Sequence, residues 1–335
     1  MDLEVAGTVE LYLTRSKKCN ISVNFVQSRA LNPLLARWQL SLVNLAGLLR
    51  DHMHRCYELH VFQGTPQVYS LLSDPDLKMP LLESLTLPIV SDLPFIRSAT
   101  KLQTIRAECI ERNFKGSATV KNVELATTKP GGYLPSFPKA KIVTLLPLRT
   151  RRTPPTSRVF RSNSTSSLTV VATWDTMVTI QELLCEVELP NLESLTLSHV
   201  GFPGPPLRSD CIRRPLEGSS SLKELTLREF PIRSQDMLNI LEMAPRLTSL
   251  SIYDSSYPLV GPYRPISKTL LVALEDPNIV PDLEKLNIFW RYDVDIDGSL
   301  VERLLETRGD RLVDIETSKG RITARSPCVH QAKRN

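Results

Sequence analysis

One motif occurs five times along this 335-residue chain and constrains its fold more than any other feature. Each copy has a leucine, a second leucine three positions later, and a leucine or isoleucine two positions after that. A proline lies two positions before the first leucine in four of the five copies. Repetition of this kind is typical of solenoid proteins, in which similar units stack on one another. The copies span residues 80–87, 190–197, 220–227, 245–252 and 281–288.

The spacing within the motif predicts a short strand. Its last two apolar positions are two residues apart, so their side chains share one face of a strand. Weaker copies fit the same frame, and we expect two or three more between Leu125 and Leu192. The weaker copies are Cys56, Leu59 and Val61; Leu102, Ile105 and Ala107; Val120, Val123 and Leu125; and Leu312, Ile315 and Thr317.

Apolar residues at helical spacing precede most copies, which predicts a helix before each strand. Ser234 and Ser267 precede two of these segments and are expected N-caps. The repeat prolines follow the segments, where proline can end a helix. The expected helices cover residues 68–72, 177–184, 237–243, 270–274 and 300–305.

These features predict an α/β solenoid. No single helix–strand unit can bury its own apolar face, so neighbouring units must stack. We expect a curved parallel sheet on the concave side and helices on the convex side. The chain divides into N-terminal strands and a capping helix (1–60), irregular repeats (61–317) and a frayed tail (318–335). The N-terminal strands are expected around 9–13 and 21–25, and the helix over 34–49. Loop insertions are expected near 127–167, 201–221 and 257–265.

The motif resembles that of the leucine-rich-repeat family. Its order of helix, proline and L-x-x-L-x-L strand is most similar to the irregular repeats of fungal F-box-type proteins. Residues 9–23 (VELYLTRS, then CNISV) resemble the L-x-R-S-x-x-x-P-L passage that follows the F-box in such proteins. Residues 54–61 (HRCYELHV) resemble their H-x-x-R-W-x-x-L-x-L passage. The resemblance implies the substrate-recruiting region of a ubiquitin-ligase receptor.

The F-box itself is not found. Nothing in residues 1–60 matches its L-P-x-E-[IL] opening, so binding to a ligase adaptor is expected only if an F-box lies upstream. Otherwise the chain is an F-box-less derivative. The alternative is an orphan leucine-rich-repeat scaffold, or a gene-model fragment, with no ubiquitin-ligase role.

The cysteine content, apolar runs and charge of the chain indicate where in the cell the protein resides and what it binds. The six cysteines form no C-x-x-C pair and indicate reduced thiols, so a cytoplasmic or nuclear protein that is not secreted is expected. Asp2 and Glu4 do not suit a signal peptide, and the apolar runs are shorter than the roughly 20 residues of a membrane span. The net charge of +5 comes largely from arginines within 149–161, which we interpret as solvated surface rather than a nucleic-acid site. We expect a monomer that binds neither membrane nor nucleic acid.

Motifs for catalysis or cofactor binding are weak. The sequence lacks a G-x-S-x-G elbow, a P-loop and a G-x-G-x-x-G loop, and His199 is expected just after a strand. His52, His54 and Cys56, with His60 nearby, have metal-ligand chemistry. Cys56, however, occupies a leucine position of a repeat, so a structural role is favoured. Residues 293–298 (DVDIDG) resemble the start of a calcium loop, but its twelfth position is Leu304 instead of glutamate. We therefore predict a non-catalytic protein with no metal or cofactor.

The outward residues of the strands remain as the predicted binding surface. Side chains between the inward leucines point to the opposite, concave face. Towards the C-terminus they gain the aromatic and arginine character that is typical of binding hot spots. The alternative is that they merely tolerate solvent. The predicted partner-binding residues are Thr196, Ser198, Thr226, Arg228, Ser251, Tyr253, Asn287, Phe289 and Arg291.

Overall fold

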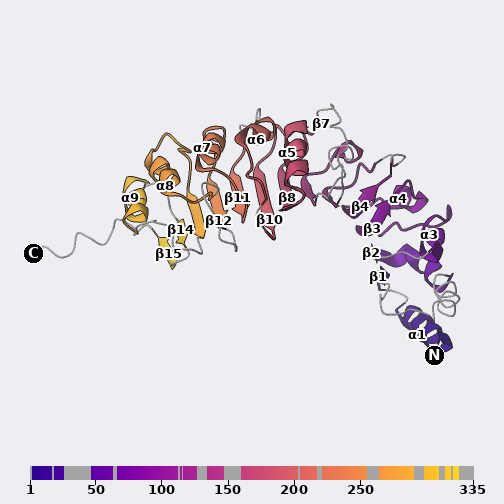
Figure 1. Cartoon of the computed structure of the whole chain (residues 1–335). Coiled ribbons are helices and arrows are strands. Elements are labelled where there is room, and N and C mark those ends of the chain that lie inside the picture. The colour runs from indigo at the N-terminus through magenta and orange to yellow at the C-terminus, as the bar shows by residue number, and fades with distance from the viewer. Residues whose placement is uncertain are drawn as a thin grey trace, which may run out of the picture. The chain divides into compact units, whose positions relative to one another are not determined.

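A computed structural model of the chain shows two compact α/β units (Figure 1). Unit 1 comprises residues 1–127 and 133–141, and unit 2 comprises 128–132 and 142–335. The structure describes residues 2–16, 19–25, 47–62, 66–111, 114, 116–126, 134–146, 160–202, 204–216, 221–254, 264–289, 298–308, 314–317 and 320–323.

Unit 1 contains a parallel sheet in which each strand pairs with the next along the chain. Its strands are β1 (Ile21–Phe25), β2 (Cys56–Val61), β3 (Ser84–Val90), β4 (Thr104–Ile110) and β5 (Asn122–Leu125). Its helices are α1 (Asp2–Arg15), η1 (Met53–Arg55), α3 (Pro66–Leu72), α4 (Pro94–Ser98) and η3 (Leu134–Ser136).

Unit 2 contains a longer sheet with the order β6-β8-β10-β11-β12-β13-β14-β15. All neighbours are parallel except the last pair. The strands are β6 (Ile142–Leu145), β8 (Ser167–Thr173), β10 (Ser194–Val200), β11 (Glu224–Arg228), β12 (Ser249–Tyr253), β13 (Lys285–Phe289), β14 (Asp314–Thr317) and β15 (Gly320–Thr323). Strands β7 (Phe160–Arg161) and β9 (Val187–Glu188) form a small separate pair.

Helices line one side of the unit 2 strands (Figure 1). They are α5 (Met177–Glu186), α6 (Ser209–Leu216), α7 (Ser234–Glu242), α8 (Lys268–Glu275) and α9 (Gly298–Arg308). The five helical segments predicted to precede the repeat strands are confirmed, as α3, α5, α7, α8 and α9. Ser267 caps α8 as predicted, because its side chain accepts a hydrogen bond from the backbone N–H of Leu270. Ser234 does not cap α7: it is the first helical residue, and its hydroxyl donates to Ser267.

The repeated leucines form the core. All fifteen apolar positions of the five strong copies are at most 1% exposed. In unit 2 the middle leucines are register partners, so Leu195, Leu225, Leu250 and Leu286 lie in one row across four strands. Burial of each such side chain contributes about 1.5–3 kcal/mol, so this row is a large part of the driving force for stacking. The α/β class with parallel sheets and helices is therefore confirmed.

Two repeats hidden between Leu125 and Leu192 are also present. β6 buries Val143 and Leu145 in the motif frame, and β8 buries Leu168 and Val170. Their first positions hold Ala140 and Thr165, both buried. The strand spacing is thus preserved although the leading leucine is not, which explains why the sequence motif is weak here.

The structure corrects three expectations. Residues 9–13 lie in helix α1, not in a strand: Leu13 is 3% exposed but Leu11 is 49% exposed, so alternate residues do not share a buried face. The expected insertion at 201–221 contains helix α6, which buries Cys211, Ile212, Pro215 and Leu216 at helical spacing. The expected frayed tail contains β15, which pairs antiparallel with β14.

Several expectations fall on residues outside the described ranges. Residues 47–50 are helical, but the rest of the helix expected over 34–49 lies outside. The same holds for Leu312, for most of the basic 149–161 segment and the 257–265 insertion, and for all of the 293–298 motif except Gly298, the first residue of α9.

Candidate functional site

The predicted partner-binding residues lie in two adjacent rows across the unit 2 sheet. The side of this sheet opposite to the buried leucines is called the outer face. Thr196, Thr226, Ser251 and Asn287 are successive register partners in one row. Ser198, Arg228, Tyr253 and Phe289 are successive partners in the other. Parallel pairing without a register shift therefore brings together residues up to 91 positions apart.

The second row contains an aromatic cluster, defined as Arg228, Tyr253 and Phe289. The Tyr253 and Phe289 rings are stacked, with centroids 4.8 Å apart and planes 2° from parallel. The Arg228 guanidinium carbon lies 5.1 Å from the centre of the Tyr253 ring. Neighbouring strands are about 4.7–4.9 Å apart, so register partners naturally place flat rings at stacking distance. The cluster therefore follows from the strand spacing and from the side chains at these positions.

The aromatic cluster has the chemistry of a binding surface. Arg228 is exposed, while Tyr253 and Phe289 are partly buried and hold their rings in one arrangement. A guanidinium over an aromatic ring is attracted by about 0.5–1 kcal/mol at an exposed site. Among the described residues no ion pair involves Arg228. In this part of the chain the Arg228 guanidinium lies beside the Tyr253 ring.

The first row is polar and uncharged. The Asn287 side-chain amide donates to the Ser251 hydroxyl over 3.1 Å. Ser251 is 8% exposed, so it offers a partner little surface of its own. Thr196 and Thr226 are partly exposed, as is Ser198 in the second row. The structure thus places eight of the nine predicted residues on one face, and Arg291 lies outside the described residues.

Three exposed apolar residues near β8 and β10 are not among the binding residues predicted from the sequence. Val200 is the last residue of β10 and is a register partner of Thr173. Trp174 and Phe202, in the segments that follow these two strands, are 57% and 68% exposed. The sequence shows only a large apolar residue just after each strand. This signal is weak, because the side chain of such a residue can equally well pack in the core. They extend the apolar character of unit 2 beyond the aromatic cluster.

Unit 1 has a different outer surface, which carries an ion pair between neighbouring strands. The Arg106 guanidinium lies 3.1 Å from the Glu124 carboxylate, and the two residues are register partners on β4 and β5. The His60 Nδ1 atom is hydrogen-bonded to the Thr86 hydroxyl over 2.8 Å. Unit 1 thus pairs a strand cation with a carboxylate, whereas Arg228 of the aromatic cluster makes no ion pair among the described residues.

The residues considered as metal ligands have packing roles. Cys56 is fully buried in the first position of its repeat, and burial raises the pKa of its thiol to about 12. His54 Nδ1 contacts the Asp51 carbonyl at 2.8 Å. Arg55, which lies between His54 and Cys56 in the sequence, is buried and contacts a ring nitrogen of His52. No group of three metal-ligating residues occurs within the described ranges.

His199 lies within β10, whereas the sequence predicts a position just after the strand. It is 2% exposed, its ring meets Phe230 edge to face, and its Nε2 atom has no hydrogen-bond partner among the described atoms. Burial lowers the pKa of His199, and the nearby charge of Glu229 partly offsets that effect. His199 therefore packs as a neutral core side chain.

Comparisons with known proteins assign no family. No protein-family model matches the chain, and a search of curated proteins found no match. Within the described part of the chain, no helix has the length and apolar character needed to cross a membrane.

Proposed function

We propose that this chain is a leucine-rich-repeat solenoid that recognises a protein partner through the outer face of unit 2. Its role is binding and not catalysis. The solenoid part of the proposal is supported by the burial of every strong motif position and by the parallel register of successive repeats. A sheet built from stacked repeats offers a long continuous surface, which suits recognition of another protein.

The aromatic cluster is the observation that carries the recognition proposal. Tyrosine and arginine are enriched among residues that dominate binding energy, and preformed side chains lose little entropy on binding. Tyr253, Phe289 and Arg228 are already held together in the free chain. The polar row beside them, with Thr196 and Thr226, supplies the hydrogen-bonding groups typical of an interface rim.

The resemblance to fungal F-box-type proteins extends this proposal to substrate recruitment by a ubiquitin ligase. That role requires an F-box, and residues 1–60 lack its opening motif. A second candidate is a repeat scaffold that binds its partner without a ligase. Both candidates use the same outer face, and they differ in whether ligase subunits accompany the partner.

A paired-substitution experiment tests the recognition proposal. The double variant Tyr253→Ala/Phe289→Ala removes both rings of the aromatic cluster. We expect partner capture from cell extract to fall at least about tenfold, as for hot-spot residues. The free energy of unfolding should fall by roughly 0.5–1.5 kcal/mol for the lost ring pair, in addition to the contribution of its buried area.

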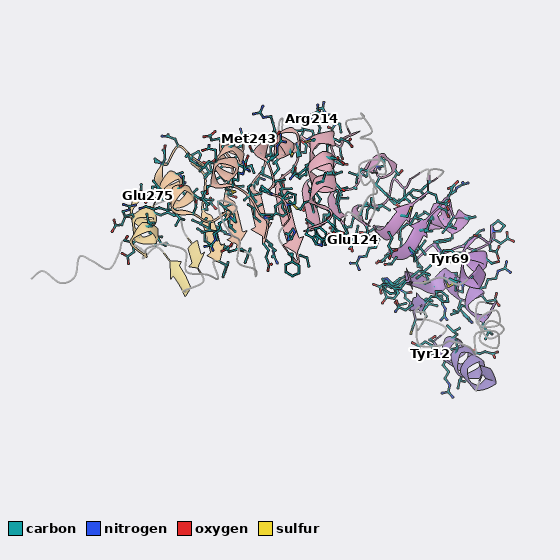
Figure 2. The ribbon with its side chains drawn as sticks, viewed as in Figure 1. Tyr12, Tyr69, Glu124, Arg214, Met243 and Glu275 are labelled. Carbon is teal, nitrogen blue, oxygen red and sulfur yellow. The ribbon has the colours of Figure 1, made fainter. Side chains whose placement is uncertain are left out.

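The matched control is Tyr12→Ala/Phe62→Ala, which makes the same chemical change at exposed positions of unit 1 (Tyr12 is labelled in Figure 2). Capture by this variant should equal that of the wild type. Equal capture by both double variants would contradict the proposed site.

A further inference from the structure

Two cysteines from neighbouring helices meet on the helix side of unit 2. Cys185 lies in the last turn of α5 and Cys211 lies near the start of α6, and the two helices pack against each other. The two thiols are within hydrogen-bonding reach. The Arg214 guanidinium donates to the Cys185 carbonyl over 3.1 Å and ties α6 to the end of α5 (Arg214 is labelled in Figure 2).

The two thiols differ in access and in surroundings. Cys185 is partly exposed, whereas Cys211 is buried. Cys211 donates to the Asp210 carboxylate over 3.6 Å, and Arg208 in turn pairs with that carboxylate. Burial also raises the pKa of the Cys211 thiol to about 12. Because Cys185 is the more exposed of the two, an oxidant reaches Cys185 first.

We propose that Cys185 and Cys211 form a redox modification site at which a peroxide converts the two thiols to a disulfide between α5 and α6. Cys185 attacks one peroxide oxygen; the O–O bond breaks, and sulfenic acid and water result. Cys211 then attacks the Cys185 sulfur, the S–O bond breaks, and a second water leaves. Two thiols lose two electrons and two protons in total, and one hydrogen peroxide is reduced to two waters.

The geometry favours this pair over the other described cysteines. Cys211 lies one helical turn before Arg214 on α6, and Arg214 contacts the Cys185 carbonyl, so both cysteines lie where α5 and α6 pack together. Cys19 and Cys109 are exposed, Cys56 is buried, and all three belong to unit 1. The Cys56 and Cys109 thiols donate to the carbonyls of Glu58 and Ile110. The disulfide would close the segment from α5 to α6, which contains β9 and β10. It lies on the helix side, so it does not depend on the recognition proposed for the outer face.

Peptide mapping of the full chain tests the site directly. The folded protein is treated with hydrogen peroxide, alkylated and digested with trypsin without reductant. Cleavage after arginine and lysine releases residues 162–208, which contain Cys185, and residues 209–213, which contain Cys211. We expect a linked 162–208/209–213 pair, a loss of two free thiols per chain, and recovery of both thiols on reduction. The melting temperature should rise on oxidation, because a cross-link restricts the unfolded chain.

Variants separate a specific pair from general oxidation. Cys185→Ser should abolish the linked peptides, and Cys211→Ser should leave a sulfenic acid at Cys185 that dimedone traps. Cys109→Ser, which removes an exposed thiol of unit 1, should leave the linked pair unchanged. The proposal is overturned if both cysteines stay alkylated while Cys19 and Cys109 are oxidised, or if urea-unfolded protein yields as much of the linked pair as folded protein.

Discussion

Single buried side chains hold parts of this fold that the repeat motif does not cover. Two buried arginines bind backbone carbonyls where helices end. Arg55 donates to the carbonyls of Leu13 and Ser16 at the C-terminal end of α1. Arg308 donates to the Val280 carbonyl over 2.9 Å and to two carbonyls of the turn that follows α8. The last carbonyls of a helix lack intrahelical partners, and a guanidinium satisfies several of them at once.

At the residue scale, Leu250→Ala tests the inward repeat frame. Leu250 is fully buried in the leucine row, so truncation should cost about 2–5 kcal/mol through lost burial and a residual cavity. Urea unfolding followed by circular dichroism measures the change. Ser249→Ala, on the same strand but partly exposed, should change stability by less than about 0.5 kcal/mol. A loss below about 1 kcal/mol for Leu250→Ala would contradict the frame.

His199 predicts a pH dependence of stability. Burial lowers its pKa in the folded state, so below about pH 6.5 the unfolded chain binds a proton that the folded chain does not. Acidification from pH 7.5 to 5.5 should therefore reduce the free energy of unfolding, by at most about 1.4 kcal/mol per pH unit from this group. Above pH 7.5 the group is neutral in both states and contributes no slope.

Urea midpoints of wild type and His199→Leu at both pH values isolate this contribution. The variant should lose less stability on acidification than the wild type. Val200→Leu changes an exposed neighbour of His199 that does not titrate, and it should keep the wild-type slope. Parallel pH profiles for wild type and His199→Leu would show that protonation of His199 does not oppose folding.

At the element scale, strands and helices differ in how well local pattern predicts them. The strands follow the L-x-L period, and even the weak copies at β6 and β8 keep it. Val9, Leu11 and Leu13 are apolar at alternate positions, which is the pattern of a short strand, so the sequence predicts a strand where the structure has helix α1. Helix α6 was hidden by Pro215 and by the proline-rich segment before it. In both cases the contacts that stabilise the helix come from distant residues, such as Arg55 for α1.

Arg55→Met tests the anchoring of α1. Methionine keeps much of the apolar stem but cannot donate to the carbonyls of Leu13 and Ser16. We expect amide hydrogen exchange in residues 2–15 to accelerate severalfold while exchange in β10–β13 is unchanged. Arg50→Met is the control, because Arg50 is about half exposed and pairs with Asp74 at the surface. Unchanged exchange in Arg55→Met would mean that other contacts hold α1.

At the scale of the whole molecule, the regular register of unit 2 turns a local pattern into a surface. Each of the strands β10–β13 contributes two side chains to the two rows, and neither Tyr253 nor Phe289 alone makes a distinctive site. Pairing Tyr253 with Phe289 and Arg228 with Tyr253 aligns them across three strands. The same register aligns Thr196, Thr226 and Asn287 beside them. The outer face is therefore a property of the stack and not of any single repeat.

Affinity capture of the tagged chain from its own cells distinguishes the two candidate roles. If the chain is a ligase receptor, a cullin and its adaptor should co-purify with the partner. If it is a free-standing scaffold, the partner should be recovered without ligase subunits. Recovery of each protein should fall in Tyr253→Ala/Phe289→Ala only if that protein is reached through the outer face. Ligase subunits that persist while the partner is lost would place their contact elsewhere on the chain.

Leucine spacing was sufficient to predict the α/β class, the parallel strands and the side of the strands that faces solvent. These features follow from a period of two within each strand and from the need of every repeat to bury one face. The ring stack of Tyr253 and Phe289, the approach of Cys185 to Cys211 and the binding of α1 by Arg55 depend instead on residues about 25 to 40 positions apart. No local pattern encodes such distances, because the register and the packing of neighbouring repeats set them.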